Sequence, residues 1–357
     1  MDILAEITGI KYSPFLCKKL EIYDIQDLDT ALVKDGSFIL DLKGKGRVAL
    51  SWWVSPKRTR SYPYARVYDT LKFDGKKVTV IPIMKDEGIE GDRDFLQWDT
   101  VSLMSLLGIY VIIGYYKHAE KSRRYANKIT NQRFDSDYIR KEINDLLSFQ
   151  SDALHWNLYQ VEKVGEIAKI ALSYYEQISK SLGVKMHSMS HAEKRINEII
   201  KGKEAFMKLS RELSKKAQSR ESITKQPKEK LSGIKAKLTI KNYLGGYYFF
   251  TCDEVEIKDE TVYLIEGKHS KHNLIPSLED IKDGLLKMML FTNLKKVEVK
   301  GKEYKPIAVL KLTSDLILSK EKLKPSQSRI IDLLMQEARQ NNFILRINDT
   351  NLTNFAC

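Results

Sequence analysis

The sequence predicts an α/β (α+β) protein in which a mixed sheet core is flanked by helices, with a β-rich N-terminal region and a helical insertion. Three observations support this class. Residues 1–116 alternate short β-branched or aromatic runs with turn residues. Residues 117–231 are poor in Gly and Pro and repeat apolar side chains at helical spacing. Residues 232–357 return to alternating strands and helices, and we expect a helix at 190–216 to pack on this third region.

Strand composition marks three runs in the N-terminal region: Val48–Val54, Ala65–Tyr68 and Lys77–Met84. The uncharged stretch Thr100–Tyr116 is slightly short for a membrane span and contains Ser and Gly. It predicts an amphipathic helix at Thr100–Leu107 and then a buried strand at Ile109–Tyr115. We therefore expect no membrane association.

Helical spacing covers Phe134–Leu182 and Ser190–Lys216, whereas Lys215–Lys230 has almost no apolar residues and predicts an exposed basic linker. The last region contains the remaining elements. The expected strands are Ala236–Lys241, Tyr247–Ile257, Thr261–Gly267, Val297–Val299, Ile307–Leu312 and Phe343–Ile347. The expected helices are Leu278–Leu290 and Ser326–Asn341.

The charge balance favours a polyanionic partner. The chain carries 60 Lys and Arg against 47 Asp and Glu, which gives a net charge of +13, and the segment 185–237 carries most of the excess. Such a field attracts nucleic acid or an anionic membrane surface. Because no basic helix with a clean apolar face stands out, we expect nucleic acid rather than membrane.

The cysteines indicate a reducing compartment. Cys17, Cys252 and Cys357 are odd in number and far apart, so neither a disulfide framework nor a cysteine-rich zinc site is expected. The acidic residues near Met1 are not typical of a secretory signal. We expect a cytoplasmic protein.

One constellation indicates chemistry. Asp253 lies on a predicted strand, a polar turn follows at Lys258–Glu260, and the next strand ends in Glu266-Gly267-Lys268. In an antiparallel hairpin Asp253 and Glu266 become cross-strand neighbours, about 5 Å apart. Because side chains alternate along a strand, Glu266 and Lys268 point to the same face.

Two carboxylates and a lysine on one face are typical of a divalent cation site. Hard carboxylate oxygens suit Mg²⁺, so Asp253 and Glu266 are the expected metal ligands. The ion can polarise a phosphoryl oxygen and lower the pKa of a bound water. Lys268 can orient that water or stabilise the developing negative charge. The alternative is an exposed hairpin edge that carries charges for solubility.

These three residues resemble the motif of the PD-(D/E)XK nuclease superfamily, in which an acid is followed after a variable gap by (D/E)xK. The predicted order of helix, three strands, helix and strand also resembles that family, over roughly residues 190–315. The resemblance implies a restriction-endonuclease-like core and catalysis by Asp253, Glu266 and Lys268. Cys252 stands where many members have Pro, and a further acid from the preceding helix would be Glu193 or Glu198.

The resemblance further implies a type II restriction endonuclease, which cuts double-stranded DNA to leave 5′-phosphate and 3′-hydroxyl ends. It implies Mg²⁺ as cofactor, a cognate methyltransferase in the same system and, for symmetric cutting, a homodimer. Two alternatives remain open: a repair or structure-specific nuclease, and a non-catalytic nucleic-acid-binding protein.

Contacts to DNA are expected from basic side chains beside aromatic ones in residues 1–116, from the segment after Ile109–Tyr115, and from donors that follow Lys268. The candidates are Lys57, Arg58, Arg60, Arg123, Arg124, His269 and Lys271. The structural alternative for each is a solvated basic loop.

Overall fold

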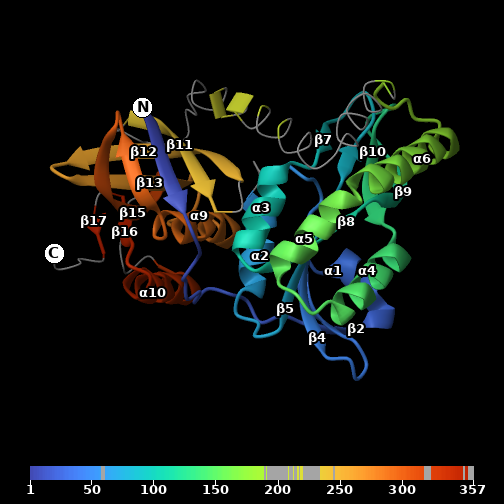
Figure 1. Cartoon of the computed structure of the whole chain (residues 1–357), viewed down its shortest axis with the longest axis horizontal. Helices are drawn as coiled ribbons and strands as arrows, with labels where there is room; N and C mark the ends of the chain where they lie inside the picture. Colours follow the sequence, from blue (N-terminus) through green and yellow to red (C-terminus); the bar gives the residue numbers. More distant parts are fainter. Residues whose placement is uncertain are drawn as a thin grey trace. The chain divides into compact units, whose positions relative to one another are not determined.

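The computed structural model describes residues 1–57, 61–188, 190, 208, 212, 215–216, 218–219, 234–243, 246–316, 323–348 and 350–352. It is a mixed α/β protein with a large mixed sheet, which confirms the predicted class. The chain forms two compact units (Figure 1). Unit 1 comprises Met1–Lys18 and Leu213–Cys357, and unit 2 comprises Lys19–Glu212.

These units divide the chain differently from the three expected regions, because the first strand of the chain belongs with the C-terminal part. The expected helix at 190–216 and the expected linker at 215–230 lie almost wholly outside the described residues.

Unit 1 is built on one large sheet. Its strands are β1 (Asp2–Ile7), β11 (Ile234–Asn242), β12 (Tyr247–Lys258), β13 (Thr261–Ser270), β14 (Lys295–Val299), β15 (Lys302–Ser314), β16 (Ile344–Ile347) and β17 (Thr350–Asn351). Its hydrogen-bonded order is β13-β12-β11-β1-β14-β15-β16-β17, and β15 also pairs with β13. The ladder from β13 round to β15 therefore closes on itself.

Strand β1 completes this ring. It pairs in parallel with β11 and antiparallel with β14, and its side chains alternate between buried and exposed positions. The chain that follows β1 packs on the helix α10 (Pro325–Gln340), where Tyr12 and the backbone of Phe15 donate to the buried carboxylate of Glu337 at 2.7 and 2.9 Å. The sequence analysis assigned no strand to Asp2–Ile7, although Ile3, Ala5 and Ile7 alternate with its other residues; its partners, which lie more than two hundred positions later, could not be read from the sequence.

The helix α9 (Leu278–Phe291) lies in the connection from β13 to β15, before β14, and β13 and β15 are parallel from Thr261–Lys305 to Ser270–Ser314. Ser277 caps its first turn by accepting from the Asp280 amide at 3.2 Å. Gly284 allows the helix to approach the sheet closely, since a Cβ there would lie 2.8 Å from Leu310 Cδ1 and 3.3 Å from Lys268 Cε.

Unit 2 has a smaller, mostly parallel sheet in the order β2-β3-β4-β5-β8. The strands of unit 2 are β2 (Ile22–Asp24), β3 (Ser37–Asp41), β4 (Arg47–Trp52), β5 (Lys76–Pro82), β6 (Met84–Asp86), β7 (Arg93–Phe95), β8 (Ile109–Gly114), β9 (Tyr116–Lys121) and β10 (Ile129–Phe134). Of these, β6 pairs with β7 and β9 pairs with β10 in two separate two-stranded sheets. Its helices are η1 (Ile25–Asp27), α1 (Leu28–Lys34), α2 (Ser61–Thr70), α3 (Trp98–Leu106), α4 (Ser136–Ser148), α5 (Ala153–Glu162) and α6 (Val164–Leu182).

Helix α5 covers the outer edge of strand β8. Asn157 accepts from the Val111 amide at 2.7 Å and donates to the Ile109 carbonyl at 2.9 Å, while Trp156 Nε1 donates to the Val111 carbonyl at 2.8 Å. Gln160 accepts from the Ile113 amide at 3.1 Å. Side chains of one helix thus replace the hydrogen bonds of a missing neighbouring strand, which protects the edge.

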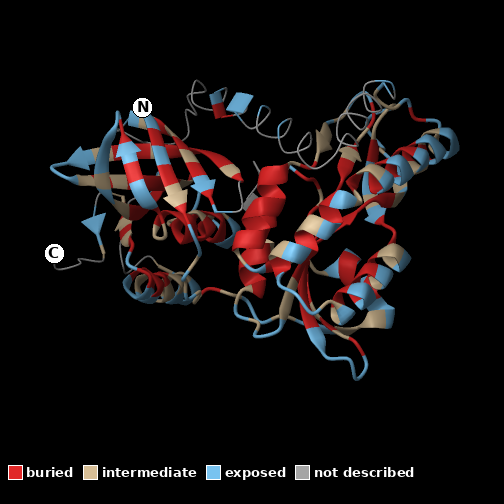
Figure 2. Ribbon diagram, in the orientation of Figure 1, coloured by how far each residue is buried: buried red, intermediate tan, exposed pale blue. Residues whose placement is uncertain are grey.

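Two predictions in this unit are wrong in part. Ala65–Tyr68 belongs to the helix α2, because Tyr64, Val67 and Tyr68 bury one helical face despite their strand propensity. The helix expected at Thr100–Leu107 is present as α3, but every one of its residues is buried rather than one face (Figure 2). Strand β8 lies where it was expected.

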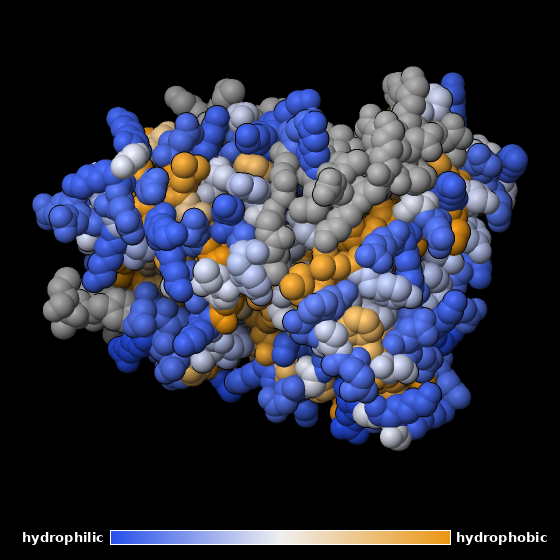
Figure 3. All heavy atoms as spheres, viewed as in Figure 1, coloured by the Kyte–Doolittle hydropathy of each residue, from blue (hydrophilic) through white to orange (hydrophobic). Residues whose placement is uncertain are grey.

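The surface agrees with the charged composition, since the face seen in Figure 3 is mostly hydrophilic. No helix within the described ranges combines the length and the apolar character needed to cross a bilayer.

Candidate active site

The predicted site lies on β12 and β13, at the point where the pairing between these two strands ends. The β12–β13 ladder runs from Lys258–Thr261 to Glu254–Ile265. One residue further on, the register of β12 against β11 shifts, so that Asp253 and Glu254 lie opposite Lys235 alone. This β-bulge changes the direction of one side chain at the point where two strands diverge.

Asp253 takes over a backbone hydrogen bond at this point. Its Oδ2 accepts from the amide of Gly267 at 3.0 Å, although Gly267 lies beyond the paired part of the hairpin. The ladder thus ends one pair short of the cross-strand pair Asp253–Glu266 that the sequence predicts, and Asp253 reaches β13 through the Gly267 amide instead.

Glu266 is 1% exposed and contacts two lysines. Its Oε1 lies 2.9 Å from Lys268 Nζ, which agrees with the prediction that both side chains share one face of β13. Lys287 Nζ lies 2.8 Å from each of the two Glu266 oxygens. A buried carboxylate is thus shared by two ammonium groups, one from the sheet and one from α9.

Helix α9 supplies the other half of the site. Asp283 and Lys287 lie one turn apart on it and therefore face the same side. The carboxylate of Asp283 accepts a hydrogen bond from Lys268 Nζ, and both side chains are mostly buried. Gly284, between them, leaves room for the aliphatic part of Lys268.

The opposite charges of this cluster shift one another's pKa values in the direction that favours the charged forms. Burial acts to raise the pKa of Glu266, but Lys287 and Lys268 outweigh it and hold that pKa below its usual value. Burial acts to lower the pKa of Lys268, but Glu266 and Asp283 raise it above normal. The pKa of Lys287 is likewise raised by Glu266, Asp253 and Asp283 against the effect of burial. Both lysines are therefore ammonium ions at neutral pH.

The donor set suits a magnesium ion. Asp253 and Glu266 are hard oxygen donors on one side of the divergence between β12 and β13. Mg²⁺ is commonly bound by one or two carboxylates, with waters and substrate phosphate completing its shell. No group of three or more His, Cys, Asp or Glu side chains assembled for metal binding occurs among the residues described. Asp253 and Glu266 therefore fit the mode in which one or two carboxylates bind the ion and water and phosphate oxygens complete its shell.

The predicted DNA contacts lie in different places. Lys57 is exposed in unit 2 and lies 3.5 Å from the carboxylate of Asp94, whereas Arg58 and Arg60 lie outside the described residues. Arg123 and Arg124 are exposed in the turn between β9 and β10. Arg124 donates its amide to Ser122 Oγ at 3.2 Å.

The two remaining candidates follow Lys268 in unit 1. The side chain of His269 is mostly buried and its Nδ1 lies 2.9 Å from Thr313 Oγ1 on β15. Lys271 is exposed just beyond the end of β13. Of these two, Lys271 has the accessible charge.

Sequence reasoning missed Asp283 and Lys287. It looked for a further acid on the preceding helix, at Glu193 or Glu198, and both of these lie outside the described residues. A signal existed: the part of α9 from Asp283 to Phe291 is apolar except for Asp283 and Lys287, two opposite charges four positions apart. Charged residues at buried helical positions need partners, which is a reason to look for a site opposite them.

Searches of protein-family models, of curated proteins and of solved structures find no match to this chain.

Proposed function

We propose that this chain is a Mg²⁺-dependent endonuclease that hydrolyses phosphodiester bonds in double-stranded DNA. The observation that carries the proposal is the mostly buried ion pair of Glu266 and Lys268 where β12 and β13 separate, together with the Asp253 carboxylate, which accepts from the Gly267 amide between them. The antiparallel order β11-β12-β13, followed by α9 and the parallel strand β15, supports it as well. This corresponds to the three strands, helix and strand that the resemblance to the PD-(D/E)XK superfamily implies, with β14 between α9 and β15; the expected preceding helix lies almost wholly outside the described residues.

Asp253 and Glu266 would hold the ion, which supplies Lewis-acid polarisation of a phosphoryl oxygen and a water of lowered pKa when bound. The ammonium group of Lys268 lies next to Glu266, one of the two proposed metal ligands. Because its pKa is raised, Lys268 stabilises negative charge on the phosphoryl group rather than removing a proton from water. Asp283 holds the Lys268 ammonium in position.

We further propose that the enzyme is of the type II restriction class and acts as a homodimer on a symmetric sequence. In support, unit 2 is a separate compact unit of mixed structure with an exposed basic turn at Arg123 and Arg124. A unit of this size is sufficient to contact base edges as well as phosphates.

The test is incubation of the purified full chain with plasmid and phage DNA, with Mg²⁺ or with EDTA. We expect discrete fragments in Mg²⁺ and intact DNA in EDTA. An unresolved smear would favour a nuclease without sequence preference, such as a repair enzyme. Intact DNA in both would contradict the proposed activity.

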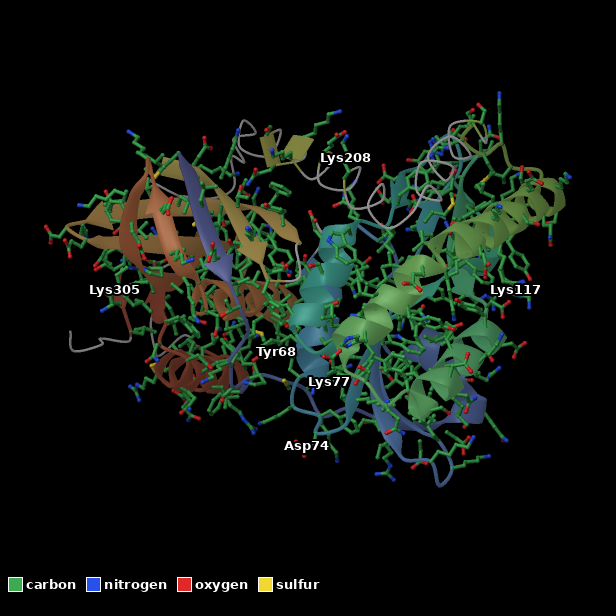
Figure 4. The ribbon with its side chains drawn as sticks, in the orientation of Figure 1. Tyr68, Asp74, Lys77, Lys117, Lys208 and Lys305 are labelled. Carbon is green, nitrogen blue, oxygen red and sulfur yellow. The ribbon has the colours of Figure 1, made fainter. Side chains whose placement is uncertain are left out.

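Two pairs of variants locate the activity. Asp253→Asn keeps an acceptor for Gly267 but removes a charge, whereas Asp259→Asn makes the same change in the exposed hairpin turn. Lys268→Met removes the ammonium group, whereas Lys305→Met does so at the far end of the β13–β15 ladder (Figure 4). We expect each site variant to lose about 10²- to 10³-fold in rate or more, and each control to cleave normally.

A further inference from the structure

Lys287 forms an ion pair with the carboxylate of Glu266, which is one of the two expected ligands of the proposed metal ion. Its Nζ lies 2.8 Å from both Glu266 oxygens, so one ammonium group bridges them. The side chain is mostly buried, and no water layer separates the pair at that distance. An ion that binds Glu266 must displace Lys287 or accept a positive charge as a close neighbour.

The charges of the cluster make that competition costly for a metal ion alone. Asp253, Glu266 and Asp283 are opposed by Lys268 and Lys287, so three carboxylates and two ammonium groups leave one formal negative charge. A divalent cation would reverse the sign of this balance in a poorly solvated place. A phosphodiester group, with its single negative charge, would then restore neutrality. Charge balance therefore favours the joint arrival of metal and DNA.

We infer that Lys287 is a built-in competitor that keeps Glu266 from binding a divalent ion until the DNA phosphate is present. The inference rests on the proposed function and concerns how that same site is regulated. Lys287 is a positioning residue in this account: it holds Glu266 in place while DNA is absent. Once displaced, its charge is available to the bound phosphate, so each ligand promotes binding of the other.

The experiment is a calorimetric titration of the full-length protein with MgCl₂ in the absence of DNA. We expect Lys287→Met to bind Mg²⁺ at least tenfold more tightly than the unmodified chain, because the competing charge is gone. Lys296→Met is the matched control, since it breaks a lysine–glutamate pair of 2.9 Å with Glu6 on the surface of the same unit. We expect its affinity for Mg²⁺ to be unchanged.

A second titration separates the two proposals. CaCl₂ replaces MgCl₂, and a DNA duplex that carries a site the enzyme cuts is added. Tighter Ca²⁺ binding by the unmodified chain with DNA than without it supports the inference. If the unmodified chain binds an ion with DNA while Lys287→Met binds no more tightly without DNA, the inference fails and the proposed function stands. If no divalent ion binds under any condition, both proposals fail.

Loss of folding in the methionine variant would not end the test. Lys287→Gln keeps a hydrogen-bond donor toward Glu266 without the charge, and circular dichroism shows whether each variant is folded. A folded glutamine variant that binds Mg²⁺ more weakly than the unmodified chain would show that Lys287 only supports the structure and would overturn the inference.

Discussion

Two groups of buried polar side chains, one on α5 of unit 2 and one around Glu266 of unit 1, have different kinds of partner. In unit 2 the buried amides of Asn157 and Gln160 bind backbone groups of β8, so each completes the ladder of a sheet that would otherwise have an open edge. In unit 1 the buried side chains of Glu266 and Lys268 bind other charged side chains, and the sheet around them closes without their help.

The two kinds of partner call for different explanations of why the side chain is buried. A side chain that satisfies a backbone group has a structural reason to be buried, and this is sufficient to explain it. A buried charge whose partners are themselves buried charges has no such reason, because apolar residues of similar size would stabilise the fold as well or better. The cluster in unit 1 is the site to which we assign the proposed function, and the following variants test the contrast between the two groups.

The largest effect is expected for Glu266→Gln. Lys268 and Lys287 would lose the anion that they share in a buried place, and the free energy of unfolding of unit 1 should fall by about 3–5 kcal/mol. Urea denaturation followed by hydrogen exchange in peptides of β13 and α9 measures this, because all four tryptophans lie in unit 2. Glu6→Gln, which breaks the surface pair with Lys296, should leave the midpoint unchanged. Equal midpoints for all three proteins would show that the cluster contributes nothing to folding.

The next effect tests the edge of unit 2. Asn157→Leu leaves the Val111 amide and the Ile109 carbonyl without their partners, which should cost unit 2 about 2–3 kcal/mol. Hydrogen exchange at β8 should accelerate, whereas Mg²⁺ binding by unit 1 should stay the same. Asn144→Ala removes only an exposed bond to the Arg140 carbonyl and serves as the control. Unchanged exchange at Val111 would contradict the role given to α5.

A smaller effect is expected for Gly284→Ala. The new methyl group would meet Leu310 Cδ1 at 2.8 Å and Lys268 Cε at 3.3 Å, so α9 or Lys268 must shift. Alanine favours a helix over glycine by about 1 kcal/mol, which offsets part of the strain. We expect stability to change by about 1 kcal/mol or less and cleavage to slow about tenfold, because Lys268 moves. Stability and cleavage that both match the unmodified chain would show that the space over Gly284 is not needed.

The smallest effect concerns Cys252, which is fully buried behind the site. Burial, reinforced by the charges of Asp253 and Glu266, raises the pKa of its thiol. In the folded chain at pH 8 a water-soluble thiol reagent should therefore label half-buried Cys17 before Cys252, as peptide mass spectrometry would show. The pKa of the Cys252 thiol is higher in the folded than in the unfolded chain. The stability that the neutral buried thiol contributes is therefore present below about pH 8.5 and is lost as the pH rises. Labelling of Cys252 as fast as Cys17 would contradict the burial.

The sequence was most informative where local rules apply. The alternation of a strand places Glu266 and Lys268 on one face, and the turn at Asp259 and Glu260 sets the register that brings Asp253 to the amide of Gly267. These deductions need only neighbouring residues. The α+β class was likewise predictable, because long periodic runs such as those of α6 and α9 are unambiguous.

It was least informative where distant segments meet. Nothing in residues Asp2–Ile7 indicates that they pair with β11 and β14. Asp283 and Lys287 interrupt the apolar pattern of α9, and only the packing of α9 on β13 shows why. Ala65–Tyr68 failed for a related reason, since tertiary packing overrode the preference of its aromatic and branched residues for strands.

Closure of the unit 1 sheet by β1 has a consequence for biosynthesis. β1 leaves the ribosome before unit 2, whereas β11 and β14 are translated only after all of unit 2, about 10–50 s later at ordinary elongation rates. During that interval unit 2 can fold while the first strand waits without its partners. A chain truncated in translation before β12 thus retains the whole of unit 2 but lacks every residue of the charged cluster.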